Sequence, residues 1–149
     1  VGSVIVEKGG EFFHGFTYSG HPASCAVALA NIRIMQRENL VDYVANDIGP
    51  YLQNKWHTLA EHPLVGETRM VGLMGALELV KDKSKLERFD EDDGVGTICR
   101  DILVDNGLVM RAVGDTIVVA PPLTLSHAEA DELLEKAWKC LDLTQAAVQ

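Results

Sequence analysis

Two short apolar runs joined by a glycine–aspartate pair place the strongest constraint on the fold of this chain. Residues 108–113 and 116–120 are rich in valine and other apolar residues, and Gly114-Asp115 between them is typical of a hairpin turn. Residues 62–80 alternate apolar residues with small or polar ones and predict one further strand, buried on at least one face. Glycines within that run mark bends or close backbone approach. The sequence therefore predicts an antiparallel sheet.

Helical periodicity occupies most of the remaining sequence, because apolar residues recur there at spacings of three and four. Pro22 suits the first turn of a helix, Ser126 and Glu129 form a capping box, and Gly49-Pro50 predicts a kink or a split. Residues 2–6 read as a short strand end. The pattern predicts an α+β fold, with a small antiparallel sheet and helices on one face. The helical segments cover residues 22–39, 40–61, 95–106 and 126–145.

The charge of the chain argues against two classes of partner. The formal net charge is −9, and no cluster of lysine and arginine is present. Nucleic acids and anionic membranes both bind basic surfaces, so neither is expected as a partner. No apolar run approaches the ~20 residues of a membrane-spanning helix, and no secretory signal is visible.

Cysteine and histidine do not predict a metal site in this sequence. Cys25, Cys99 and Cys140 are scattered, odd in number and without a C-x-x-C pair, which favours buried thiols over disulfides or zinc ligands. The five histidines lack cysteine or carboxylate partners at zinc-ligand spacing. We therefore expect no metal, and a location in the reducing cytoplasm.

The stretch FTYSGHP, residues 16–22, concentrates turn chemistry directly before a helix. Gly20 can adopt a positive φ, and the hydroxyls of Thr17, Tyr18 and Ser19 lie beside it. One interpretation is a phosphate-binding turn, because hydroxyls donate to phosphate oxygens and a helix start carries positive partial charge. The other is a tight turn whose hydroxyls cap the following helix. The residues alone leave both interpretations open.

Three stretches resemble the class III (omega) aminotransferases, which are pyridoxal-phosphate enzymes of fold type I. They are EFFHGFTYSGHPASCAVALANIRIMQRENL, VGLMGALELVKDK and GLVMRAVGDTIVVAPPLTLSHAEADELLEKA, and the resemblance covers nearly the whole chain. Within the family, the chain resembles the amine:pyruvate transaminases most. The resemblance implies a remnant of the large cofactor-binding domain with the phosphate-binding turn (residues 1–21), a long linking helix (residues 22–39) and the C-terminal small α+β domain (residues 40–149).

The resemblance also implies roles for three residues. Thr17 matches a threonine that binds the cofactor phosphate and reaches the site of the neighbouring subunit, and Phe16 matches a residue that lines the same phosphate pocket. Arg111 matches a mobile arginine that pairs with the carboxylate of an amino-acid or keto-acid substrate. A guanidinium binds a carboxylate as a bidentate fork, which is compatible with that role. The alternative for Arg111 is a surface salt bridge to Asp115 or to the helix at residues 95–106.

The resemblance places no catalytic residue within this chain. The Schiff-base lysine of the family lies upstream of the threonine matching Thr17, and Lys8, the only lysine before that motif, stands where the family has none. We therefore expect a fragment of a transaminase that moves an amino group between an amine or amino acid and a keto acid such as pyruvate. Pyridoxal 5'-phosphate belongs to the parent enzyme, and the fragment alone is expected to be inactive.

Other interpretations stay open at this point. One is a free-standing, non-catalytic α+β module that binds a small ligand or forms a dimer. Another is an aminomutase or a decarboxylating enzyme of the same fold. Residues 4–6, Phe12, Phe13, Phe16 and Tyr18 form an apolar segment that is expected to dock on the small domain or on another copy, which favours a homo-oligomer.

Overall fold

The computed structural model describes residues 2–10 and 15–148, and the chain divides into two units, Val1–Glu38 and Asn39–Gln149. Phe12 and Phe13 of the expected apolar segment lie outside the described residues. None of the helices in the described ranges is long and apolar enough to cross a membrane. In the same ranges, no group of three or more histidine, cysteine, aspartate or glutamate residues could hold a metal ion.

The prediction of a strand end at residues 2–6 is wrong, because the first unit contains helix α1, Gly2–Lys8, at this position. A strand needs a neighbour for its backbone N–H and C=O groups, and the described residues of this unit form no other strand. A helix satisfies these groups within itself, as in the 3.0 Å bond from the Gly9 N–H to the Ile5 carbonyl oxygen. A short apolar run fits either state until its surroundings decide.

The helix expected from Pro22 is present as α2, Pro22–Arg37. Pro22 occupies the first turn, where its missing N–H has no intrahelical partner to lose. The helix ends before Asn39, whose φ of 52° is left-handed. Most large apolar side chains of α1 and α2 are exposed, as are Phe16 and Tyr18, whereas Met35 is half-buried. The expected docking of this apolar segment on the small domain or on another copy stays a prediction.

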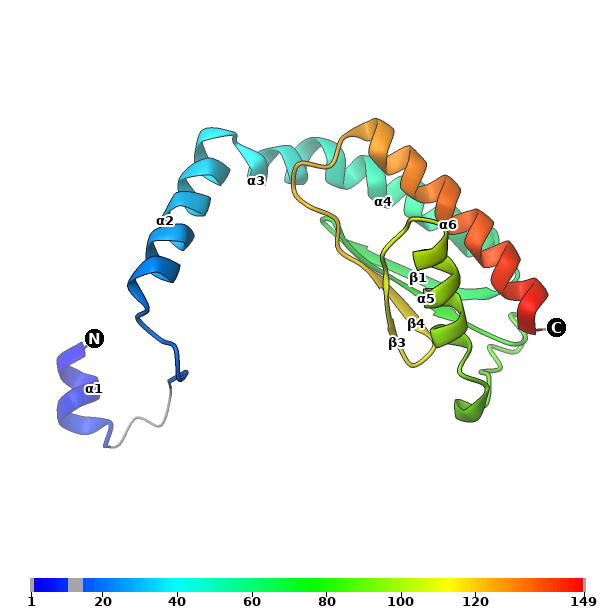
Figure 1. The fold of residues 1–149 in the computed structure, drawn as a ribbon, viewed down its shortest axis with the longest axis horizontal. Coiled ribbons are helices and arrows are strands. Elements are labelled where there is room, and N and C mark those ends of the chain that lie inside the picture. The colour runs from blue at the N-terminus through cyan, green and yellow to red at the C-terminus, as the bar shows by residue number, and fades with distance from the viewer. Residues whose placement is uncertain (1, 11–14, 149) are drawn as a thin grey trace. The chain divides into compact units, whose positions relative to one another are not determined.

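The second unit is built on a four-stranded antiparallel sheet with the order β1-β2-β4-β3 (Figure 1). The hairpin predicted around Gly114-Asp115 is confirmed as β3–β4, and Gly114 adopts a positive φ of 55° in its turn. This hairpin places β3 at one edge of the sheet, with β4 as its single neighbour. The strands span Val65–Val71 (β1), Met74–Leu79 (β2), Arg111–Val113 (β3) and Thr116–Val119 (β4).

The prediction of a single strand within residues 62–80 is wrong, because this run folds into the β1–β2 hairpin. Val71 pairs with Met74, so the chain reverses over the two residues between them, and Gly72 supplies a positive φ of 57°. The expected close approach occurs at Gly75. A Cβ atom there would lie 2.4 Å from Met70 Cε and 3.2 Å from the ring of Trp56.

The split predicted at Gly49-Pro50 is confirmed. A π-helix, Val44–Ile48 (η1), separates α3, Leu40–Tyr43, from α4, Gly49–Thr58. The Gly49 N–H donates to the Val44 carbonyl oxygen five residues back, which widens the turn directly before Pro50. Pro50 has no N–H and its ring crowds the preceding turn, so a regular α-helix cannot continue through it undistorted. A 3-10 turn, Leu59–Glu61 (η2), follows α4.

The two C-terminal helices also match their sequence signals. Helix α5 spans Val95–Asp105, after the 3-10 turn Glu91–Asp93 (η3), and helix α6 spans His127–Val148. The capping box of α6 is confirmed, because the Ser126 N–H donates to Glu129 Oε2 at 2.8 Å and the Glu129 N–H donates to Ser126 Oγ at 3.3 Å. The hydroxyl and N–H of Ser126 hold the pKa of Glu129 below its usual value.

One face of the sheet and the helices α4, α5 and α6 enclose the core (Figure 1). Met70, Gly75 and Val119 lie side by side on this face, so the α+β class with helices on one face is confirmed. Cys99 and Cys140 are buried free thiols, and burial raises the pKa of Cys99 to about 11, whereas Cys25 is exposed, contrary to expectation. The fully buried large side chains include Trp56, Ile48, Leu52, Leu59, Leu77, Leu79, Leu103, Ile117 and Leu141.

Candidate functional site

The turn before α2 is closed by Ser19. The Ser19 N–H donates to the Phe16 carbonyl oxygen at 2.9 Å, and the Phe16 N–H donates to Ser19 Oγ at 3.0 Å. Thr17 and Tyr18 are therefore the two central residues of the turn, and both are exposed. Within the described part of the chain, the Thr17 hydroxyl has no hydrogen-bond partner. A hydroxyl at the tip of such a turn can donate to an anion.

The start of α2 is capped by an imidazole rather than by a hydroxyl. His21 is the N-cap, and its Nδ1 accepts the Ser24 N–H at 3.4 Å. The interpretation in which the turn's hydroxyls cap this helix is therefore not what the structure shows. Gly20 carries the positive φ of 74° that lets the chain leave the turn. Hydroxyl donors on an exposed turn before a helix N-terminus fit the chemistry of a phosphate group.

Arg111 lies on the face of the sheet that the helices leave open. Its cross-strand partner is Val118, which pairs with Ala76, which in turn pairs with Arg69. The row Arg111–Val118–Ala76–Arg69 thus crosses all four strands on the side opposite the core. Two arginines occupy the ends of this row, separated by two small apolar side chains.

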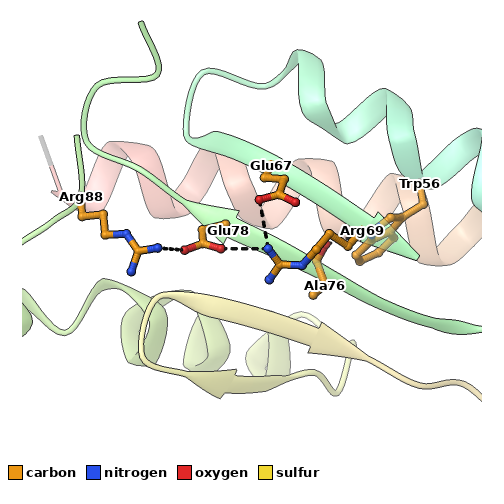
Figure 2. A network of polar contacts seen from close by, with 6 residues as sticks. All are labelled: Trp56, Glu67, Arg69, Ala76, Glu78 and Arg88. Carbon is orange, nitrogen blue, oxygen red and sulfur yellow. Dashed lines mark hydrogen bonds and ion pairs between the residues drawn. The ribbon is translucent and has the colours of Figure 1, made fainter. Parts of the chain in front are cut away.

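Arg69 is neutralised by acidic neighbours in the next row. Its Nη1 donates to Glu67 Oε2 at 3.0 Å and to Glu78 Oε2 at 3.1 Å, while Arg88 Nη2 donates to Glu78 Oε1 at 2.6 Å. Figure 2 shows the Glu78 carboxylate between the two guanidinium groups. Two cations and two anions therefore balance, and the hydrogen bonds to Glu78 and Glu67 raise the pKa of Arg69.

Arg111 differs from Arg69 in having no such counter-charge. It is exposed, and no ion pair or hydrogen bond joins its side chain to another described residue. The alternative of a salt bridge to Asp115 is not found, because the Asp115 carboxylate faces α5, where its Oδ1 accepts the Gly96 N–H at 2.9 Å. Exposed Val109 and Val113 stand two residues before and two residues after Arg111. An unpaired guanidinium in an apolar setting is suited to binding a carboxylate ligand.

The sequence predicts the candidate residues but not the groups around them. Phe16 and Thr17 lie together in one turn of the first unit, and Arg111 lies in the second unit, so the structure describes two separate candidate groups. The sequence does not predict two sets of contacts, which are the Arg69–Glu78–Arg88 network and the Asp115–Gly96 hydrogen bond. The one available signal for the network is Glu78, a charged residue within the apolar run GALEL.

Comparison with known proteins identifies relatives of nearly the whole chain. The family model for class-III aminotransferases matches residues 3–141. The putrescine–pyruvate aminotransferase of Pseudomonas aeruginosa is 56% identical over 144 residues, which cover 97% of this chain and 31% of that protein. Gamma aminobutyrate transaminase 1 of Solanum lycopersicum, a mitochondrial protein, is 40% identical over 95% of this chain and 27% of its own length.

Solved structures give the same result for the fold. The PMP-bound aminotransferase of Vibrio fluvialis matches with a TM-score of 0.85 and 38% identity, over 99% of this chain and 32% of that chain. A thermostable (S)-enantioselective omega-transaminase from Thermomicrobium roseum matches with a TM-score of 0.85 and 40% identity, over 96% of this chain and 32% of that chain. The chain thus spans 27–32% of the length of these relatives, and it belongs to the class-III aminotransferases.

Proposed function

We propose that this chain is the C-terminal portion of a pyridoxal-phosphate-dependent transaminase. The parent enzyme transfers an amino group from an amine or amino acid to a keto acid such as pyruvate. The observation that carries the proposal is the unpaired Arg111 on the open face of the sheet, in a chain 56% identical to a putrescine–pyruvate aminotransferase. Because the chain spans 31% of that relative, the activity is a property of the longer polypeptide.

The chain contributes binding groups rather than the reacting group. Thr17 donates its free hydroxyl to the cofactor phosphate, and Phe16 lines the pocket around it. Bound pyridoxal phosphate supplies the electron sink on which amino transfer depends. We further propose that Thr17 serves the site of a second copy, which makes the enzyme a homo-oligomer. The cytoplasmic location and the division of the chain at residues 21 and 39 stay predictions.

Arg111 explains how one site accepts two kinds of substrate. A keto acid brings a carboxylate, which the guanidinium binds as a fork. An amine such as putrescine brings none, so the long and exposed side chain withdraws into solvent at little cost. We therefore propose a diamine or another simple amine as donor, and a short 2-keto acid as acceptor.

The experiment uses the complete polypeptide encoded by the gene that contains this sequence. With pyridoxal phosphate, putrescine and pyruvate, alanine is expected to form in proportion to putrescine consumed. Omission of pyruvate is expected to stop turnover after one equivalent of amine per active site. Release of carbon dioxide, or a rearranged amine without alanine, indicates a decarboxylase or an aminomutase and contradicts the proposal. No turnover with any amine and keto acid, in protein that binds the cofactor, also contradicts it.

Replacing Thr17 tests the proposed phosphate contact. Thr17→Val keeps the shape of the side chain and removes its donor, so the affinity of the complete polypeptide for pyridoxal phosphate is expected to fall about tenfold, which corresponds to ~1.5 kcal/mol for one hydrogen bond to a charged group. Titration of the apoprotein, followed by cofactor absorbance, measures this. Thr17→Ser retains the hydroxyl and is expected to stay close to the unchanged protein. Equal affinity of the valine variant and the unchanged protein rejects the contact.

A further inference from the structure

We infer that Asp115 is a positioning residue for Arg111. Its carboxylate anchors the β3–β4 turn to the first turn of α5 and thereby fixes the edge strand on which Arg111 stands. The inference rests on the proposed role of Arg111 in binding substrate carboxylate. Asp115 does not contact substrate in this scheme, and its effect passes through the backbone of β3.

The strand that carries Arg111 has little support of its own. It is only 3 residues long, and it lies at the edge of the sheet with β4 as its one neighbour. Arg111 is its first residue and pairs with Val118, while Val113, its last, pairs with Thr116. A short edge strand with so few ladder bonds opens easily unless another element holds it. The turn at the end of this hairpin is where such a support acts.

Asp115 ties that turn to two other elements. Its Oδ1 accepts the Gly96 N–H at 2.9 Å, and its backbone carbonyl oxygen accepts the Leu79 N–H at 3.0 Å. The N-cap of α5 is Gly94, which has no side chain to cap the helix. The carboxylate of Asp115 therefore supplies the missing cap from the hairpin, where the positive end of the helix favours a negative charge.

Gly96 provides the space for this contact. It is buried, and a Cβ atom on it would lie 1.9 Å from the Gly114 carbonyl oxygen and 3.0 Å from Asp115 Cα. These atoms belong to the backbone of the turn, so an added methyl group must push the turn and α5 apart. Asp115 and Gly96 thus form the two sides of one clamp, and either side can be changed independently.

The clamp also holds the charge of Asp115 away from Arg111. Asp115 is the acidic residue nearest to Arg111 in the sequence, but it follows the strand on the side of Ile117, whereas Arg111 lies on the open face beside Val118. Because α5 binds Asp115 Oδ1, the charge of Asp115 points to the helix side of the hairpin. The same bond that fixes the strand therefore keeps Arg111 available to a substrate anion.

Asp115→Ala and Gly96→Ala in the complete polypeptide test the clamp from its two sides. Each variant is expected to raise KM for pyruvate about five- to tenfold, because the guanidinium no longer lies where the carboxylate arrives. The single-turnover rate with putrescine alone is expected to stay within about twofold, because that half-reaction presents no carboxylate. Asp115→Asn keeps an oxygen acceptor for the Gly96 N–H and is expected to preserve KM for pyruvate within about twofold.

Two control variants separate this effect from general changes in α5. Asp101→Ala removes an exposed carboxylate whose partner is its neighbour Arg100, and it is expected to leave both half-reactions unchanged. Leu103→Ala removes a buried side chain of the same helix and is expected to lower the melting temperature without a carboxylate-selective change in KM.

The outcomes distinguish this inference from the proposed function. Equal losses in both half-reactions for Asp115→Ala, or a lower melting temperature with unchanged KM for pyruvate, overturn the positioning role. If Arg111→Leu is selective for carboxylate substrates and neither clamp variant is, only the inference about Asp115 fails. If Arg111→Leu itself shows no such selectivity, the proposed role of Arg111 fails, and the role of Asp115 fails with it.

Discussion

Replacing Arg111 by leucine is expected to lower kcat/KM for pyruvate roughly 10- to 100-fold in the complete polypeptide, with the putrescine half-reaction unchanged within about twofold. Hydrogen bonds to a charged group contribute about 1.5–3 kcal/mol, and the leucine side chain makes none of them. Steady-state kinetics with pyruvate and single-turnover kinetics with putrescine measure the two half-reactions separately. Arg111→Lys keeps the charge but not the planar fork, so an intermediate loss is expected.

Arg69→Leu is the matched control for that prediction. Arg69 stands at the other end of the same row of the open face, but its guanidinium is held by Glu67 and Glu78. Its removal is expected to lower the stability of the sheet and to leave the KM for pyruvate unchanged. If the two leucine variants lose activity toward pyruvate alike, the role assigned to Arg111 is wrong.

Replacing Trp56 by alanine is expected to lower the free energy of unfolding by about 3–5 kcal/mol. The side chain is fully buried, its ring fills the space that Gly75 leaves, and its Nε1–H donates to the Ala76 carbonyl oxygen at 3.3 Å (Figure 2). The alanine variant therefore leaves a cavity between α4 and β2 and removes this hydrogen bond to the Ala76 carbonyl oxygen. Urea unfolding of the 149-residue chain, followed by circular dichroism, measures the change.

Trp56→Phe separates the two contributions. It retains most of the apolar ring and loses only the N–H donor and some volume, so a smaller cost of about 1–2 kcal/mol is expected. This variant gives a measurable transition even if the alanine variant does not fold. A cost below about 1 kcal/mol for Trp56→Ala contradicts the position assigned to this residue in the core.

The elements that the sequence predicts correctly depend on local chemistry. Pro22 begins a helix, Gly114-Asp115 turns a hairpin and Ser126 caps α6, because each of these signals acts within a few residues of itself. The β1–β2 hairpin cannot be predicted in this way, because no polar residues mark its turn at Gly72. The alternation of apolar and small residues continues through the turn, as it would in one strand.

The surroundings of the candidate site depend instead on which strands become neighbours. Nothing local in the sequence shows that Glu78 pairs with Arg69 and Arg88 and not with Arg111. That choice follows from the strand order, which places β2 between β1 and β4 and moves β3 to the edge. Non-local pairing of this kind sets the charge environment of Arg111, so only the folded structure reveals that this cation is unpaired.

Because β3 lies at the margin of the sheet, core packing and acceptor preference depend on different strands. Packing of the interior depends on the central strands β2 and β4, which supply Leu77 and Ile117. Acceptor preference depends on the exposed side chains of a border strand, Arg111 and Val113, which lie outside that core. Libraries that vary the exposed Val109 and Val113 and keep Arg111, Gly114 and Asp115 can therefore diversify the range of accepted keto acids while the protein keeps its thermal tolerance.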